Sequence, residues 1–268
     1  LYATWSDGAT RLVVGDHGFV ARATGEGALR RVRVPTSVAL HAVTMNARGV
    51  ALAVGAEGTI LRSTDRGARW RRVAVPAAER SFHAVWLDDE GHAVAVGERG
   101  HRFRSDDGGR TWQSLSLGRD DHMIGMTAHG STLWVVGADG RIERSEDHGR
   151  TWQAEAPPAP AIDLKHVLVT ERGTLLVTTR PGTVWRRDAS GRWTSIVVHP
   201  SALLSGIAGG ARRIVAVASD GASFVSTDDG ATWSADRPAT REVLTSVFVA
   251  PDGRAYATGY WGVLLTRP

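Results

Sequence analysis

Ser105-Asp106-Asp107-Gly108-Gly109-Arg110-Thr111-Trp112 is the stretch that decides the fold. Its pattern, S-x-D-x-G-x-x-W, recurs at residues 63–70, 145–152 and 226–233. The Asp can accept hydrogen bonds from backbone N–H groups of its own turn, and the Gly supplies the positive φ of a tight reversal. The Trp begins the next strand, where its ring can be buried while the indole N–H donates a hydrogen bond. The repeat therefore predicts a hairpin staple copied around a larger object.

We expect these repeats, called Asp-boxes below, to be structural. The alternative is that their acids bind carbohydrate or metal. The residues concerned are Ser63, Asp65, Gly67, Trp70; Ser105, Asp107, Gly109, Trp112; Ser145, Asp147, Gly149, Trp152; and Ser226, Asp228, Gly230, Trp233.

A second marker, G-x-x-G after small and β-branched residues, gives the period. It starts at Gly15, Gly55, Gly97, Gly137 and Gly259, with degenerate copies near residues 179–182 and 218–221. Units of about 40 residues with four short strands each are typical of a β-propeller. We therefore predict an all-β chain: a single seven-bladed β-propeller with four-stranded antiparallel blades. Its approximate units are 1–35, 36–76, 77–117, 118–158, 159–199, 200–238 and 239–268.

One unit illustrates the expected strands. In the second unit they are Leu40–Met45 (innermost) and residues 50–55, 59–63 and 70–75. The seventh unit supplies only three strands, so either its blade has three or an outer strand comes from residues outside this chain. No segment has a persuasive helical period.

Composition limits the possible partners and compartments. A hydrophobic content of 42% with 31 Gly suits a folded, turn-rich β protein, and no apolar run is long enough to span a membrane. The net charge of +4 comes with no run of five Lys or Arg, so we expect no nucleic-acid partner. The absence of cysteine fits either a cytoplasmic or an exported protein, with export slightly favoured.

Both markers together resemble the Asp-box (bacterial neuraminidase repeat) propellers, and most closely the photosystem II stability/assembly factor family and its bacterial relatives. The resemblance is strongest at residues 96–112 and 136–152 and covers essentially the whole chain. It implies a non-catalytic scaffold that binds other proteins. The box is largely eroded in unit five (residues 186–193), and unit one has lost its Asp.

An enzyme is the rival class. A sialidase needs a Tyr nucleophile with a Glu partner, and none of Tyr2, Tyr256 and Tyr260 is convincingly paired with one. Other glycoside hydrolases need two converging carboxylates, for which Asp120, Asp121, Asp163 and Glu242 are the candidates between blades.

Histidines offer a metal-dependent alternative. His41, His83 and His122 occupy equivalent places near the start of innermost strands, and His166 lies close to that place in unit five. Imidazoles around the channel mouth would suit zinc, copper or iron, whereas packing between blades is the bland alternative. Otherwise we expect no cofactor.

The same face should carry the turns between second and third strands (B–C turns). They contribute the candidate binding residues His17, Glu57, Arg99, Asp139, Tyr260 and Trp261. An exposed Tyr-Trp pair near Arg is typical of a protein-binding surface, and a small-molecule or glycan ligand is also possible. The alternative is that Trp261 merely covers the seam between blades seven and one.

An arginine directly precedes the Asp-box Ser, or the equivalent position in unit five, in four consecutive units. These residues, called the arginine row below, are Arg62, Arg104, Arg144 and Arg186. We expect these side chains to pair with carboxylates of a neighbouring blade, the alternative being a basic stripe for an acidic partner.

Overall fold

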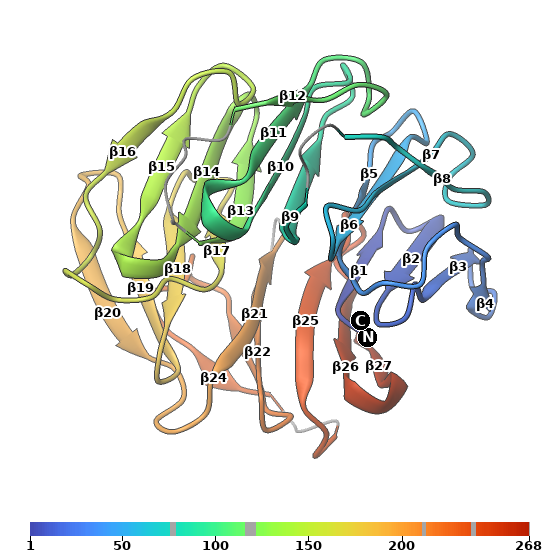
Figure 1. Cartoon of the computed structure of the whole chain (residues 1–268). Helices are drawn as coiled ribbons and strands as arrows, with labels where there is room; N and C mark the ends of the chain where they lie inside the picture. Colours follow the sequence, from blue (N-terminus) through green and yellow to red (C-terminus); the bar gives the residue numbers. More distant parts are fainter. Residues whose placement is uncertain (76–78, 116–121, 211–212, 237–239, 268) are drawn as a thin grey trace.

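In the computed structural model the chain forms seven antiparallel sheets, six with four strands and one with three. The structure describes residues 1–75, 79–115, 122–210, 213–236 and 240–267. Figure 1 shows the sheets arranged around a common centre in chain order, from blue to red. The prediction of a seven-bladed β-propeller is confirmed.

The strands follow the chain blade by blade. Blade 1 contains β1 (Ala3–Ser6), β2 (Thr10–Val14), β3 (Val20–Thr24) and β4 (Arg30–Arg31); blade 2 contains β5 (Leu40–Met45), β6 (Ala51–Gly55), β7 (Ile60–Ser63) and β8 (Arg71–Arg72); blade 3 contains β9 (Phe82–Leu87), β10 (Ala93–Gly97), β11 (Arg102–Ser105) and β12 (Gln113–Ser114); blade 4 contains β13 (Met123–His129), β14 (Thr132–Gly137), β15 (Ile142–Ser145) and β16 (Gln153–Glu155). Blade 5 contains β17 (Val167–Val169), β18 (Leu175–Thr179), β19 (Thr183–Arg187) and β20 (Trp193–Val197); blade 6 contains β21 (Leu204–Gly209), β22 (Ile214–Ala218), β23 (Ser223–Ser226) and β24 (Ser234–Ala235); blade 7 contains β25 (Leu244–Val249), β26 (Ala255–Gly259) and β27 (Leu264–Arg267).

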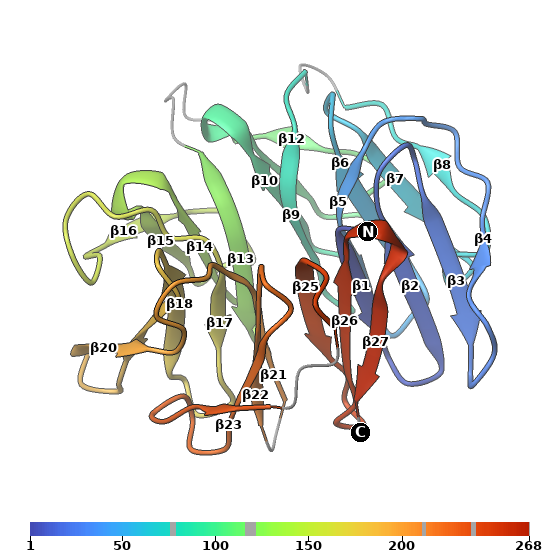
Figure 2. The same ribbon diagram turned by 90° about the horizontal axis from the view of Figure 1, so that it is seen from below.

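The core lies between the blades. Strands such as β6 and β10 are buried at every position because both of their faces are covered by neighbouring sheets. Their sequences are accordingly continuous apolar runs of small and β-branched residues instead of alternating ones. Each innermost strand packs beside the innermost strands of the blades on either side, so these strands form a ring around the axis of the propeller (Figures 1 and 2).

Blades 1 and 7 close the ring by packing, without sharing a strand within the described residues. The amino group of Leu1 donates to the Gly259 carbonyl oxygen at 3.1 Å, and Thr245 Oγ1 donates to the Leu1 carbonyl oxygen at 2.8 Å. The Trp5 and Phe248 rings lie 6.2 Å apart between centroids. Figure 2 shows β1 and β26 side by side at this junction.

The four Asp-boxes have the same internal hydrogen bonds. In blade 3, Ser105 Oγ donates to Asp107 Oδ1 at 2.8 Å and accepts the Gly109 N–H at 2.9 Å. Asp107 accepts the N–H of Thr111, and the Trp112 indole N–H donates to the Gly109 carbonyl oxygen. Because each polar group has a local partner, the turn closes at little desolvation cost.

Each Asp-box also contacts the blade before it. A Cβ on Gly109, whose φ is +76°, would lie 2.5 Å from Leu52 Cδ2 of blade 2, and one on Gly149 would lie 2.3 Å from Val94 Cγ2 of blade 3. The Asp-box glycine is thus required both by its left-handed φ and by the proximity of the neighbouring blade.

The arginines of the row donate hydrogen bonds to the next blade, across the contact between neighbouring blades that we call the joint. The acceptor differs from our expectation. Arg62 Nε donates to the Gly108 carbonyl oxygen at 2.6 Å, Arg104 Nε to that of His148 at 3.0 Å, and Arg186 Nε to that of Asp229 at 3.0 Å. Among the residues that the structure describes, Arg186 is the one member of the row that also pairs with a carboxylate of the next blade, that of Asp229. A backbone carbonyl is the constant partner because the turn geometry repeats even where side chains change.

Arg144 is the exception in that row. Its Nε is buried without a hydrogen-bond partner, and its guanidinium pairs with Glu146 and lies over the Trp134 ring. The blade that follows is blade 5, whose Asp-box is eroded. The loss of the box therefore removes the acceptor that its neighbour's arginine would use.

One strand expectation needs adjustment. The outer strand of blade 2 was expected over residues 70–75, but β8 pairs only over Arg71–Arg72, since the edge of the blade is exposed and has no second partner. Three single-turn 3-10 segments occur in B–C turns, and no helix among the described residues is long and apolar enough to cross a membrane.

Candidate functional site: the channel-mouth face

Five B–C turns share a left-handed backbone. His17, Glu57, Arg99, Asp139 and Trp261 have φ between +49° and +56°, and the glycine after each also has positive φ. Hydrogen bonds such as Phe19 N–H to the Asp16 carbonyl oxygen close the turns. Two consecutive positive φ values define the type I′ hairpin turn. All five side chains are exposed, so the predicted binding residues lie on one face, at equivalent positions of five blades.

Tyr260 and Trp261 stand out among them. Trp261 is 91% exposed and Tyr260 is 48% exposed, whereas nearly all other large apolar side chains of the described residues are covered. A left-handed φ is costly for a bulky side chain, about 1–2 kcal/mol per residue, and such strain concentrates at functional positions. The alternative expectation, that Trp261 covers the seam between blades, does not fit its exposure.

A hollow of about 360 Å³ opens at the channel mouth, and Tyr260 is part of its lining. Its walls come from the starts of innermost strands in blades 4 to 7, with Tyr2 from blade 1 and Tyr260 at its rim. Leu203 and Val243 give it apolar walls, and Lys165 and Arg180 add positive charge. Apolar walls combined with polar groups that can orient a bound molecule are usual in ligand sites.

His166 lines the same hollow and is neutral. Burial, together with the Lys165 ammonium group next to it, lowers the pKa of His166 to about 4. Its imidazole can therefore donate and accept one hydrogen bond at neutral pH without adding charge.

The four channel histidines are not brought together as a metal centre. His41 and His83 stack with 5.5 Å between centroids, and His41 Nδ1 is 2.8 Å from the Phe82 carbonyl oxygen. Burial and the nearby His41 and His122 lower the pKa of His83. Across the described ranges, no three ligand atoms of His41, His83, His122 and His166 lie within 4.8 Å of one another. The row His41–His83 instead continues to Tyr2, 5.9 Å from His41 between ring centroids.

The candidate acids do not form an evident catalytic pair. Asp163 accepts from Lys165 Nζ at 3.3 Å, and that ammonium lowers its pKa, which keeps the carboxylate ionised. Glu242 lies at the start of the blade 7 link, where its N–H donates to Thr240 Oγ1. Asp120 and Asp121 fall outside the described residues.

Sequence reasoning missed the hollow itself. Tyr2, Leu203 and Val243 belong to different units and share no letter or motif, so only their common place just before innermost strands could have indicated them, whereas Arg180 lies in the B–C turn of blade 5.

Comparison with known proteins supports the fold and gives a family. The family model described as "Photosynthesis system II assembly factor YCF48" matches residues 22–154 and 68–264. No curated protein matches the chain by sequence. The solved structure "YCF48 bound to D1 peptide" is similar at 19% identity, with a TM-score of 0.79 and coverage of 97% of this chain and 90% of that one.

Two further structures show how widely this fold is used. YCF48 from Cyanidioschyzon merolae has 17% identity and a TM-score of 0.75, covering 97% of this chain and 91% of that one. A streptogramin B lyase has 14% identity and a TM-score of 0.86, covering 99% and 93%. At such identities the likeness concerns the fold alone, because scaffolds and enzymes share it.

Proposed function

Because the chain belongs to the photosystem II assembly factor YCF48 family, we propose that it is a protein-binding scaffold whose recognition surface is the channel-mouth face. The observation that carries the proposal is the exposed Tyr260-Trp261 pair, held in a left-handed turn at the rim of the apolar hollow. Aromatic side chains fixed in this way are the usual anchors of protein interfaces.

The partner we infer is an extended protein segment that carries an apolar side chain. The hollow accepts that side chain against Leu203 and Val243, with Tyr260 as part of its lining, and the exposed Trp261 next to Tyr260 in the chain contacts the rest of the segment. That a structurally similar YCF48 has been solved with a peptide supports this reading. The Lys165 and Arg180 side chains favour a segment with an acidic group or a free carboxylate.

The test uses a photo-crosslinking amino acid placed at position 261 in the native host. Position 197 is the control, because Val197 is also a large apolar residue that is exposed (68%), but it lies on the outermost strand of blade 5, whereas Trp261 lies in the B–C turn of blade 7. We expect a discrete partner to be crosslinked from position 261 and not from position 197. A partner captured equally from both positions, or from neither, would contradict the assignment of the face.

A purified partner then allows a quantitative check with Trp261→Asn. Asn tolerates positive φ, so the free energy of unfolding should stay unchanged or rise by up to about 1 kcal/mol. Loss of an interface Trp typically costs at least about 2 kcal/mol of binding, so Kd should rise about 30-fold by calorimetry. A variant that binds as tightly as the wild type would remove Trp261 from the interface.

A further inference from the structure

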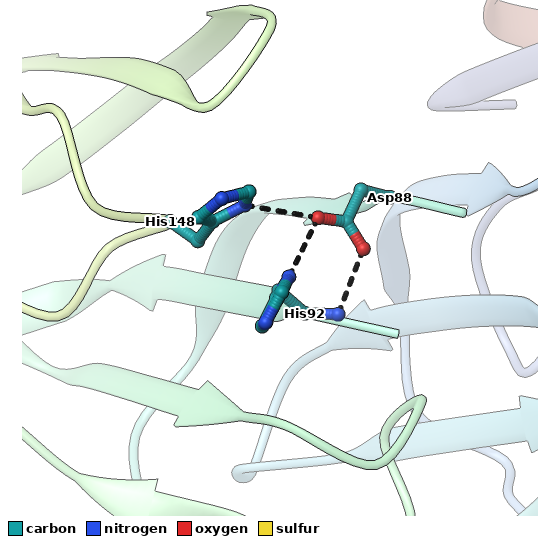
Figure 3. Close-up of side chains that lie close together, drawn as sticks. All are labelled: Asp88, His92 and His148. Atoms are coloured by element: carbon teal, nitrogen blue, oxygen red, sulfur yellow. Dashed lines mark hydrogen bonds and ion pairs between the residues drawn. The ribbon is translucent and has the colours of Figure 1, made fainter. Parts of the chain in front are cut away.

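A cluster of metal-ligating side chains lies on the opposite face, between blades 3 and 4. Asp88 follows β9, His92 precedes β10 in the same turn, and His148 belongs to the Asp-box of blade 4. Asp88 Oδ2 is 2.9 Å from His92 Nδ1 and 3.1 Å from His148 Nδ1, as Figure 3 shows. The three ligand atoms all lie within 4.8 Å of one another.

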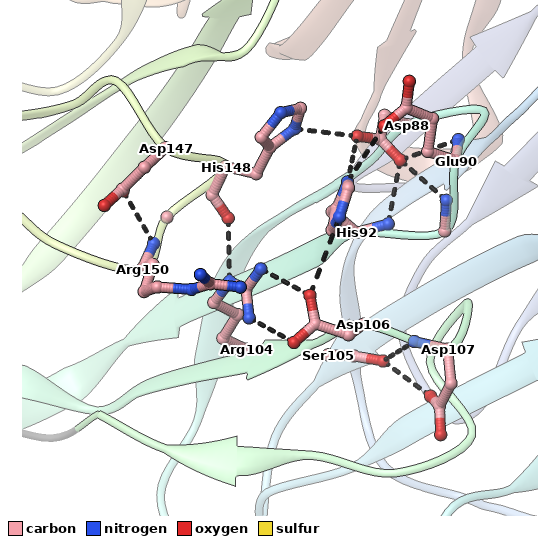
Figure 4. Close-up of polar contacts among 12 residues, drawn as sticks. Asp88, Glu90, His92, Arg104, Ser105, Asp106, Asp107, Asp147, His148 and Arg150 are labelled. Atoms are coloured by element: carbon pink, nitrogen blue, oxygen red, sulfur yellow. Dashed lines mark hydrogen bonds and ion pairs between the residues drawn. The ribbon is translucent and has the colours of Figure 1, made fainter.

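The carboxylate is held so that one oxygen is left for the two rings. Asp88 Oδ1 accepts the N–H groups of Glu90, Gly91 and His92 at 2.7–3.0 Å. Oδ2 therefore faces His92 and His148 (Figure 4). Outer hydrogen bonds of this kind orient ligands in known metal sites.

His148 is also fixed before any ligand arrives. Its carbonyl oxygen accepts from Arg104 Nε at 3.0 Å, and its N–H donates to the Ser131 carbonyl oxygen at 3.2 Å. With φ at +55°, its backbone directs the imidazole across the joint onto blade 3. The His92 and His148 ring centroids are 4.2 Å apart.

Comparison with the equivalent joint between blades 1 and 2 shows which feature of the Asp88, His92 and His148 cluster is unusual. There the residue in the place of His148 is Arg66, which forms an ion pair with Asp7. Asp7, like Asp88, lies in the first turn of the preceding blade. In one joint a guanidinium, which is not a metal ligand, pairs with the carboxylate, and in the other two imidazoles, whose ring nitrogens can bind a metal, lie beside it.

We propose that Asp88, His92 and His148 bind a divalent transition-metal ion of the zinc class across the joint between blades 3 and 4. Two imidazole nitrogens and one carboxylate oxygen are a common three-residue set for zinc. Tetrahedral bonds of 2.0–2.1 Å require ligand atoms roughly 3.3 Å apart, so the two distances from Asp88 Oδ2 to the imidazole nitrogens, 2.9 and 3.1 Å, need to open by only a few tenths of an ångström. Glu90, whose side chain is 71% exposed, lies beside these ligands, with its Oε2 3.8 Å from His92 Nδ1.

The test is zinc binding to tag-free, chelator-treated protein, followed by competition with a chromogenic chelator. We expect one zinc ion per chain with a Kd in the micromolar range or tighter, and a thermal midpoint that rises with zinc concentration. His148→Asn and His92→Asn should each weaken binding by at least about 30-fold, the loss of one ligand. Asn at position 148 tolerates the positive φ, and circular dichroism checks that both variants are folded.

Two control variants locate the site. His129→Asn removes an exposed histidine of blade 4, and His41→Asn removes one of the channel histidines. Both should bind zinc as the wild type does. Equal binding by all four variants, loss in His41→Asn alone, or no stoichiometric binding by the wild type would overturn the proposal. Substitution with cobalt adds a direct readout, because its visible absorption should report imidazole ligation in the wild type and change in His148→Asn.

Discussion

On the face that carries the Asp-boxes, Arg66, His148 and Asp229 have positive φ and their side chains contact the blade before them. On the opposite face, His17, Glu57, Asp139 and Trp261 have nearly the same φ, and their side chains are exposed to solvent. The left-handed backbone conformation is the same on both faces, and only the direction of the side chain differs.

That difference separates assembly from recognition. The Asp-box turn lies against a neighbouring sheet, so its residues are constrained by packing and their hydrogen bonds repeat from blade to blade. The B–C turn projects from the ring, so its exposed residue can vary in charge and size at little cost to the fold. We therefore expect substitutions on the two faces to act on different quantities, stability on one and binding on the other.

The largest effect should come from a pair of glycine substitutions. Gly109→Ala combines left-handed strain with a clash against Leu52, whereas Gly262→Ala has a similar φ and no atom within 4 Å of the new Cβ. Strain costs about 1–2 kcal/mol in both variants, and overpacking adds about 1–3 kcal/mol in Gly109→Ala alone. Denaturant unfolding should show the larger loss for Gly109→Ala. Equal losses of unfolding free energy in the two variants would mean that blades 2 and 3 move apart enough to accommodate the extra methyl group.

The sequence predicts the features that repeat from blade to blade better than those that do not. The Asp-boxes and the period were predictable because each copy repeats its letters, and repetition places the copies in equivalent turns. The acceptors of Arg62 and Arg104 were not, because they are backbone carbonyls and no side-chain letter marks them.

The two candidate sites were harder to predict for a related reason. Tyr2, Leu203 and Val243 meet only because the ring closes, and Asp88 lies 60 positions from His148. A His in the Asp-box place that holds Arg66 elsewhere was the one visible signal for the metal cluster.

A second pair of variants examines the joint itself. Arg104→Met removes a hydrogen bond from a charged donor to the His148 carbonyl oxygen, whereas Arg144→Met removes a buried Nε that has no partner. Both arginines also pair with the acid two positions on, but the Arg104 side chain is 5% exposed and that of Arg144 is 38% exposed, so the ion pair of Arg104 adds to the expected difference. We expect Arg104→Met to lower the free energy of unfolding by about 1.5–3 kcal/mol, and Arg144→Met to change it by less than about 1 kcal/mol. A larger loss in Arg144→Met would show that its contact with Trp134 matters more than the missing acceptor.

The smallest effect concerns the charge of an Asp-box. A hydrogen bond from Thr232 Oγ1, with one from the Thr232 N–H, lowers the pKa of Asp228 to about 2. Because the folded-state pKa lies below the ordinary value of 3.8, the unfolded state binds more protons between the two values. This contribution to stability is complete above about pH 4 and is lost as the pH falls towards 2. Solvent exposure limits it to less than about 1 kcal/mol.

Thr232→Val separates this effect from general acid unfolding. The change keeps the shape of the side chain and the carboxylate of Asp228 but removes the hydroxyl donor, so the Asp228 pKa measured by NMR should rise towards its ordinary value. The stability of the variant should correspondingly fall less between pH 5 and pH 3 than that of the wild type. An unchanged pKa would mean that the backbone N–H groups alone hold the charge. The Asp-box would then owe its ionised carboxylate to the turn geometry, as the B–C turns owe their shape to the backbone, and not to the Thr that accompanies three of its four copies.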